Sequence, residues 1–190
     1  MRLKGKKVAY LVEEGFEDLE FWVPVMRLRE EGAEVVIVGT GRQREFQGKH
    51  GLKARPDTTA DRVRAADFDA VVIPGGWAPD KLRRHDGVKR LVRDAYAQDR
   101  IVGAICHAGW VPISAGVVRG HRATGAPAIR DDLENAGAQW VDAAAFRDGN
   151  FVWGRVVEDI PDFCRALVEA IATHVPGPQR EEAGTIIGHD

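Results

Sequence analysis

The stretch at residues 101–110 constrains the fold more than any other part of the chain. An apolar run from Ile101 leads to Cys106, and an alanine lies two positions before and two positions after this cysteine. A sharp turn from a strand into a helix needs small residues at those positions, and it lifts the central side chain out of the sheet. The next segment, residues 110–115, is compatible with a helix whose N-terminal N–H groups would lower the thiol pKa. The pattern therefore predicts an exposed nucleophile rather than a buried structural cysteine.

Composition is that of an ordinary globular domain. The 190 residues are 44% hydrophobic, which is enough for a full core, so we expect one domain at residues 1–175 and a polar tail at 176–190. The formal net charge is −2 with both signs mixed along the chain, and this argues against a nucleic-acid partner. No apolar stretch is long enough for a membrane span or a secretory signal. The two cysteines, Cys106 and Cys164, lie far apart, which argues against a disulfide scaffold and favours the cytoplasm.

Apolar runs alternate with helical patterns along the first two thirds of the chain. Four runs predict buried parallel strands, at residues 8–12, 35–38, 70–73 and 101–104. Helical spacing is found from Leu19 to Leu28, at residues 87–98, at residues 129–136 and at residues 159–174. Residues 45–55 predict a small hairpin, and the turn at residues 148–150 predicts a second antiparallel pair. The alternation predicts an α/β fold with a mostly parallel sheet covered by helices on both faces.

Three loops should meet at the carboxyl ends of these strands, where such folds place their functional crevice. They are residues 13–18, 74–77 and 104–107. Glu17 in the first loop could reach Cys106, and a carboxyl beside a thiolate requires that one of the two hold a proton. The alternative is that Glu17 only stabilises the N-terminus of a helix, and the spacing does not decide between these roles.

The other two loops carry further candidates for the site. The backbone amides of Gly75 and Gly76 could form an oxyanion hole with that of His107, or these glycines could form a plain turn. His107 is the candidate base, but it needs a third group to orient it. Asp80, from the same chain or a neighbouring one, is a candidate for that group and otherwise an acid at a helix N-terminus.

The remaining candidates for function are histidine and cysteine residues. His50 lies in a glycine-flanked loop that could reach the site, although a surface position is the commoner role for such a histidine. Cys164 lies in an apolar helix and is expected in the core. Cys106 and His107 are only a pair, so we expect no metal site and no cofactor.

Several short motifs along the chain together indicate a resemblance to a known family. They are Phe16-Glu17-Asp18, Gly48-Lys49-His50-Gly51, Ile73-Pro74-Gly75-Gly76, Ala104-Ile105-Cys106-His107, Ser114-Ala115-Gly116-Val117, Asp131-Asp132 with Asn135-Ala136-Gly137, and Asp148-Gly149-Asn150. With these motifs, residues 7–171 resemble the PfpI family of intracellular cysteine peptidases. The superfamily also holds the human parkinsonism-associated deglycase and chaperone-like glyoxalases of bacteria.

The resemblance implies a flavodoxin-like three-layer sandwich with small β-hairpin additions, with Cys106 as nucleophile, His107 beside it and Glu17 in contact with the sulfur. Asp80 matches in position an acid that reaches the histidine from a neighbouring subunit, although the peptidases have the longer glutamate there. Trp77 and Trp110 would narrow the site, and Trp110 would line the substrate position. The resemblance also implies homodimers, sometimes assembled into hexamers, a role in stress and an easily oxidised cysteine.

Two classes of function remain open for the cysteine. The first is an enzyme, in which Cys106 attacks a peptide carbonyl, as in a peptidase, or a small dicarbonyl or its protein adduct, as in a glyoxalase or deglycase. The second is a non-catalytic redox sensor or chaperone-like protein that responds through oxidation of Cys106. A glutamine amidotransferase would need a His-x-Glu pair near the C-terminal end, and none of His121, His174 and His189 is followed in that way.

Overall fold

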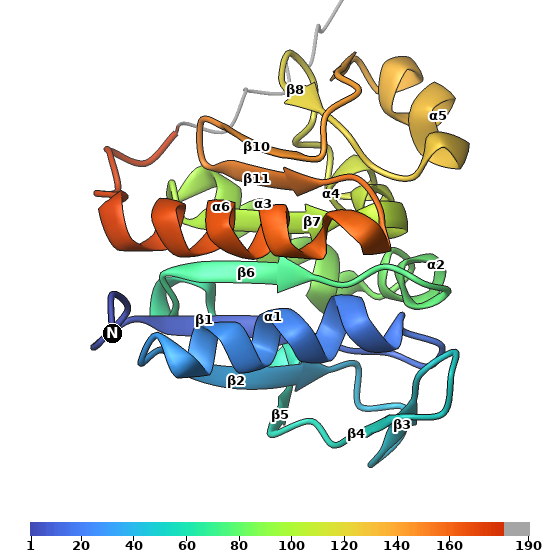
Figure 1. Ribbon diagram of the computed structural model, residues 1–190, viewed down its shortest axis with the longest axis vertical. Helices are drawn as coiled ribbons and strands as arrows, with labels where there is room; N and C mark the ends of the chain where they lie inside the picture. The colour runs from blue at the N-terminus through green and yellow to red at the C-terminus, as the bar shows by residue number, and fades with distance from the viewer. Residues whose placement is uncertain (181–190) are drawn as a thin grey trace, which may run out of the picture.

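The seven-stranded sheet of this chain has the order β10-β11-β7-β6-β1-β2-β5. It is seen in a computed structural model that describes residues 1–180 (Figure 1). The central strands are β1 (Lys7–Leu11), β2 (Glu34–Gly39), β6 (Ala70–Ile73) and β7 (Ile101–Ile105). They pair in parallel at the four predicted runs, and β5 (Thr58–Thr59) and β11 (Phe151–Gly154) extend the parallel part of the sheet. β10 (Ala145–Asp148) is the antiparallel edge, joined to β11 across the predicted turn.

Helices cover both faces of the sheet and complete the three layers of the predicted flavodoxin-like α/β sandwich. α1 (Asp18–Glu30) and α6 (Ile160–Thr173) pack side by side on one face (Figure 1). α3 (Asp86–Ala97) lies on the opposite face with the short helices α2 (Ala78–Leu82) and α4 (Trp110–Ser114). The central strands are apolar because both of their sides are covered, and every residue of β6 and β7 is buried.

The smaller elements lie at the margins of the sheet. The predicted hairpin is formed by β3 (Phe46–Gln47) and β4 (Lys53–Ala54). The segment between β5 and β6 contains two 3₁₀ turns, Ala60–Arg62 and Ala65–Asp67. A two-stranded sheet of β8 (Arg122–Ala123) and β9 (Gln139–Trp140) lies with α5 (Arg130–Asn135) beyond β10. Of the expected tail, residues 176–180 are described, and Gly177 and Arg180 donate backbone hydrogen bonds to Asp99 and Ala97; residues 181–190 lie outside the described chain.

Helix α1 differs in part from its predicted pattern. Phe21, Val25 and Leu28 are buried as the helical spacing predicts, but Leu19 and Met26 are exposed. The sequence pattern is apolar on two sides of this helix, so spacing alone could not show which side faces the sheet. Among residues 1–180, no helix has the length and apolar character that a bilayer crossing requires.

The sheet positions the site through a change in strand order. From β1 the chain moves outward to β2 and β5, and then returns to the other side of β1 to form β6 and β7. The loops after β1 and β6 therefore lie side by side, and an isolated antiparallel bridge joins Phe16 to Gly76. This is the switch point at which open α/β sheets bind their ligands.

Candidate active site

Cys106 lies at the sharp turn that the sequence predicts. Its φ is 62°, in the left-handed region that a non-glycine residue adopts only when its surroundings hold it there. Ala104 and Ala108, the small residues on each side, are buried. The turn continues as a 3₁₀ segment, Cys106–Gly109, and α4 begins only at Trp110. The half-buried cysteine side chain consequently points into the crevice rather than into the sheet.

The carboxyl next to the sulfur is that of Glu20. It lies on the inward side of α1, is fully buried, and flanks Gly75 together with the Cys106 side chain. Its Oε2 accepts a hydrogen bond of 2.9 Å from the Gly75 N–H. Its Oε1 is buried without a hydrogen-bond partner among residues 1–180, beside the Cys106 thiol in the same cavity. The sequence prediction missed this residue.

Glu17 has a different position from the one expected. Its Oε2 accepts hydrogen bonds from the backbone N–H groups of Leu19 and Glu20, at 2.9 and 2.8 Å, so the side chain caps the N-terminus of α1. It lines the same crevice but is not the carboxyl nearest the thiol, so the expected contact with the sulfur is corrected and the alternative, a helix-stabilising acid, is the one observed. The physical reason is helix geometry: an acid at the N-cap folds back onto its own helix, whereas an acid three residues later projects from the first turn.

Cys106 and Glu20 titrate as a coupled pair. Burial, with a contribution from the charge on Glu17, raises the pKa of Glu20 to about 8. Burial and the adjacent Glu20 carboxyl raise the pKa of the Cys106 thiol, even though the His107 backbone N–H donates to the sulfur. The expected lowering of the thiol pKa is therefore wrong. A 3₁₀ turn followed by a five-residue helix supplies a weak dipole, and desolvation outweighs it.

The Pro74-Gly75-Gly76 loop lies directly under this pair. The Gly75 N–H is occupied by Glu20, so it is not free to form the expected oxyanion hole. A Cβ at Gly75 would lie 2.8 Å from the Cys106 Cβ and would clash with the Glu20 carboxyl, which explains the glycine. Gly76 has φ +78° and lines the crevice, and its N–H donates to no acceptor within residues 1–180.

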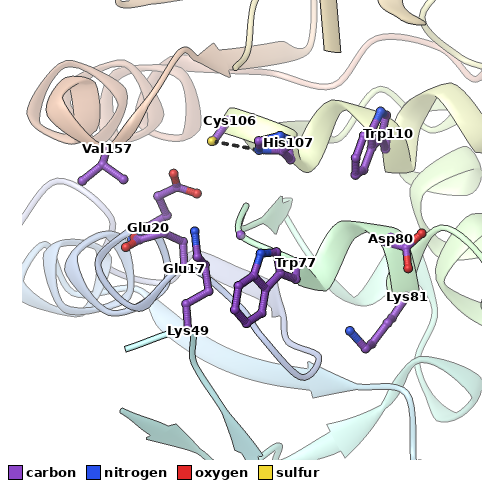
Figure 2. Close-up of a pocket in the computed structure, with 11 residues that line it drawn as sticks. Glu17, Glu20, Lys49, Trp77, Asp80, Lys81, Cys106, His107, Trp110 and Val157 are labelled. Atoms are coloured by element: carbon purple, nitrogen blue, oxygen red, sulfur yellow. Dashed lines mark hydrogen bonds between the residues drawn. The ribbon is translucent and has the colours of Figure 1, made fainter. Parts of the chain in front are cut away.

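His107 lies beside the sulfur, and within residues 1–180 of one chain no acid forms a hydrogen bond with its ring. Its Nδ1 is 3.4 Å from Sγ of Cys106 (Figure 2). Burial, with a contribution from Lys49, lowers the pKa of His107, so the ring is neutral at neutral pH. Asp80 lines the crevice, but its carboxylate pairs with Arg84 at 3.0 Å, and no hydrogen bond joins it to His107 in the described chain.

The crevice itself is a cavity of about 450 Å³ between the elbow and α1 (Figure 2). Trp110 lines it, held by an indole N–H bond of 2.8 Å to Asp132. His50 stays near the rim: its side chain is 68% exposed and its Nε2 lies 3.8 Å from Glu17. Within residues 1–180, no cluster of three or more His, Cys, Asp or Glu could hold a metal ion.

Four lining residues were missing from the sequence-based site: Glu20, Lys49, Lys81 and Val157. Glu20 could have been found as an acid on the core-facing side of α1, next to Phe21. Lys49 belongs to a quoted motif, but only the fold shows that the hairpin loop brings it beneath the elbow. Val157 comes from a 3₁₀ turn after β11, and no sequence signal marks it.

Comparison with known proteins gives consistent results. The model of the DJ-1/PfpI family matches residues 6–170. The chain is 41% identical over 165 residues to a Pyrococcus horikoshii protein named deglycase PH1704, covering 87% of this chain and 99% of that one. It is 36% identical over 170 residues to general stress protein 18 of Bacillus subtilis, covering 87% and 99%. Among solved structures, Drosophila melanogaster DJ-1beta superposes with a TM-score of 0.82 at 27% identity, over 89% of this chain and 91% of that one.

The family match extends over most of the chain, and it includes the elbow, the Pro-Gly-Gly loop and the first turn of α1. The superposition with DJ-1beta covers most of both chains, so the two proteins share the fold described above. The chain therefore belongs to the DJ-1/PfpI family.

Proposed function

We propose that this protein is a cysteine-dependent glyoxalase or deglycase that converts small α-oxo aldehydes, or their adducts with proteins, into α-hydroxy acids. One observation carries the proposal: a buried carboxyl with a pKa of about 8, one of its oxygens free of hydrogen bonds within residues 1–180, lies beside an elbow thiol in the same cavity. A carboxyl tuned in this way can exchange a proton with a carbon atom attached to the sulfur. The relatives named deglycase support the same chemistry.

The first step is addition of the thiol to the aldehyde. A bond forms between Sγ of Cys106 and the aldehyde carbon, the carbonyl π bond opens, and the thiol proton moves to the carbonyl oxygen. His107 Nδ1, 3.4 Å from Sγ, relays this proton because its lowered pKa keeps a free lone pair on the ring. The Gly76 N–H, which faces the crevice, is placed to donate to the new hydroxyl oxygen.

Glu20 then moves a proton between the two carbons of the adduct. The ionised form of Glu20 removes the hydrogen of the sulfur-bearing carbon as a proton, and the electron pair forms a double bond to the neighbouring carbon, whose carbonyl π electrons move to its oxygen. The hydroxyl proton of the sulfur-bearing carbon passes to that oxygen. Glu20 then returns its proton to the neighbouring carbon while the carbonyl of the thioester forms on the sulfur-bearing carbon, and the product is the thioester of an α-hydroxy acid. Water attacks the thioester, the C–S bond breaks, and Cys106 is regenerated as the acid leaves.

Peptide hydrolysis has less support from this site. A cysteine peptidase uses its histidine as a charged partner, held by an acid or amide. Here His107 is neutral and Asp80 pairs with Arg84. The cavity is also small and flanked by Trp77 and Trp110, which suits a compact carbonyl compound better than an extended chain.

The direct test is product formation from methylglyoxal. Wild-type protein should release lactate, and Cys106→Ser and Glu20→Gln should each lower the rate by at least about 100-fold, the range for loss of a nucleophile or a general base. Cys164→Ser is the matched control, because Cys164 is a buried cysteine outside the crevice. Absence of lactate with correctly folded wild-type protein would reject the proposal.

A second candidate function is redox sensing, for which Glu20 is again the supporting observation. With peroxide as oxidant, the sulfur would gain one oxygen per peroxide consumed, and a protonated Glu20 could donate a hydrogen bond to the oxidised sulfur. Mass spectrometry after mild peroxide should find oxygen on the half-buried Cys106 before the buried Cys164. Equal oxidation of the two cysteines would argue against this function.

Assembly and location are part of the same proposal. Helix α1 exposes Leu19, Val23 and Met26 at 47%, 40% and 61%, and these positions form one stripe at helical spacing. We propose that a second copy of the chain covers this stripe, as the homodimers of the family suggest. Met26→Glu should shift the mass measured by light scattering to that of a monomer.

The location that we propose is the cytoplasm, because two free cysteines suit a reducing compartment.

A further inference from the structure

Two lysines line the crevice, Lys49 and Lys81, and the proposed chemistry uses neither; Lys49 is the one that lies between the glutamates of α1 and Trp77, on the side of the sulfur (Figure 2). Lys49 enters the crevice from the loop between β3 and β4. The backbone of this residue is fixed by a hydrogen bond of 2.9 Å from the Lys49 N–H to the Phe16 carbonyl. The loop is further held by Asp18, whose carboxylate accepts from the N–H groups of His50 and Leu52 at 2.9 and 2.8 Å. The position of the lysine is therefore built into the fold.

The ammonium of Lys49 has no anionic partner. No salt bridge joins it to a carboxylate within residues 1–180, although Glu17 and Glu20 line the same cavity. Glu17 instead accepts from two backbone N–H groups of α1, and Glu20 accepts from the Gly75 N–H. The contact recorded for Lys49 is with the Trp77 ring, whose centroid lies 5.3 Å from Nζ. The indole holds the ammonium in place and leaves its N–H donors free.

Lys49 is also close enough to the sulfur to act on a bound substrate. Its charge lowers the pKa values of Glu20, Cys106 and His107, the three groups that surround the reacting carbon. At neutral pH Glu20 and His107 are uncharged, and the Glu17 carboxylate accepts from the α1 backbone rather than from Lys49, so the ammonium is available to pair with another anion. An anionic group on the substrate would supply the missing partner.

We propose that Lys49 is a specificity-determining residue that binds a carboxylate on the substrate, so that the site prefers α-oxo aldehydes carrying a carboxylate to neutral ones of the same size. This inference rests on the proposed glyoxalase function and names its substrate class. The carboxylate would accept hydrogen bonds from Nζ while the aldehyde carbon meets Cys106 Sγ. Trp77 lines the cavity and is 61% exposed. Its ring would cover the part of the substrate that links the aldehyde to the carboxylate.

The test compares one substrate in two charge states. γ,δ-Dioxovalerate carries the α-oxo aldehyde and a carboxylate, and its methyl ester carries the same aldehyde without the charge. Wild-type protein should use the acid with a kcat/KM about tenfold higher than the ester, as expected for one charged hydrogen bond in a partly desolvated site. Lys49→Met should bring the ratio of acid to ester close to one, and Lys49→Arg should restore most of the preference.

The matched control is Lys53→Met, a change of the same size and charge in the adjoining strand of the hairpin. Lys53 pairs with Glu45 at 3.2 Å and does not line the cavity, so its loss should leave the ratio unchanged. Equal use of acid and ester by wild-type protein, or a preference that survives in Lys49→Met, would overturn the inference while leaving glyoxalase activity intact. A thermal melt of each variant excludes a folding defect as the cause.

A binding measurement separates this inference from the proposed chemistry. Cys106→Ala protein has no nucleophile, so calorimetric titration with γ,δ-dioxovalerate reports recognition alone. Binding that is at least fivefold weaker in Cys106→Ala/Lys49→Met than in Cys106→Ala would support the role of Lys49 even if wild-type protein turned over neither compound. Equal affinity of the two proteins would reject it, whatever the outcome of the activity assay.

Discussion

The Gly75 N–H donates a hydrogen bond of 2.9 Å to Glu20 Oε2, and this bond joins the loop after β6 to the first turn of α1. The second oxygen of the carboxyl is buried without a hydrogen-bond partner among residues 1–180, and the Cys106 side chain packs against the same glycine. Three segments that are distant in sequence therefore meet at one carboxyl. Because the loop, the helix and the elbow all end at the same switch point of the sheet, the fold itself brings them together.

Gly75→Ala should disrupt this junction. The added methyl group would lie 2.8 Å from the Cys106 Cβ and 3.1 Å from the Ile105 carbonyl oxygen, and it would clash with the Glu20 carboxyl. Backbone atoms cannot yield as the end of a flexible side chain can, so we expect a loss of about 1–3 kcal/mol in the free energy of unfolding, measured with denaturant. Methylglyoxal turnover should fall as well, because the carboxyl is displaced from the sulfur.

The control for this substitution is Gly120→Ala. Gly120 has φ +80° but no atom near the position of an added Cβ, so the methyl group meets backbone strain and no steric clash. Stability should fall by about 1 kcal/mol with turnover unchanged. Equal effects of the two variants on turnover would show that contact at Gly75 is not what positions Glu20.

Glu20 should make the stability of the protein depend on pH. The pKa of this carboxyl is about 8 in the folded state, against an ordinary value of 4.5. Below both values the group is protonated in either state, and its full contribution to folding is present. As the pH rises from 4.5 to 8, the carboxyl is ionised in the unfolded chain but still protonated in the folded one. The free energy of unfolding therefore falls, on the order of a few kcal/mol in total.

Glu20→Gln should flatten this dependence, because glutamine does not ionise. Denaturant unfolding of both proteins at several pH values between 4.5 and 8 checks it, and the thiol of Cys106 titrates too high to contribute in that window. A wild-type curve parallel to that of Glu20→Gln would mean that the Glu20 carboxyl is not shifted by its surroundings.

The reactivity of the thiol should respond to the same substitution. The ionised Glu20 carboxyl is one cause of the raised thiol pKa, second to burial, and glutamine removes that charge. In a Cys164→Ser background, the pH profile of iodoacetamide alkylation should therefore move to lower pH in Glu20→Gln. Glu17→Gln provides the comparison, because Glu17 bonds to the helix N-terminus rather than to the sulfur, and its shift should be smaller.

Much of the architecture follows from patterns that the sequence displays directly. The runs in β1, β2, β6 and β7 are apolar at nearly every position, and only a sheet covered on both sides has such strands. The turn at Cys106 could also be predicted, because small neighbours at plus and minus two are a steric requirement. Both signals lie in short segments of the sequence, so they can be recognised without knowing the tertiary contacts.

The chemical details of the site could not be read in this way. Choosing between Glu17 and Glu20 requires knowing how α1 is rotated against the sheet, and the apolar residues on both sides of this helix hide that rotation. The thiol pKa depends on desolvation, which the helix-dipole argument ignores. Lys49 comes from a hairpin whose position over the elbow is set by hydrogen bonds to Asp18 and Phe16, long-range contacts that no spacing in the sequence reveals.

We expect Asp80, the acid predicted to orient His107, to contribute little to turnover. The Asp80 carboxylate is 58% exposed and pairs with Arg84. Within one chain it therefore does not contact the His107 ring or stabilise a protonated form of it. Asp80→Asn should therefore change methylglyoxal turnover by less than about twofold, the limit for an exposed ion pair of small energy. His107→Ala should lower turnover by at least about tenfold, because it removes the proton relay beside the sulfur. If Asp80→Asn instead lost activity as His107→Ala does, while Asp80→Glu kept it, the acid would have to reach the imidazole across a subunit interface, and the site would be a triad shared between two chains.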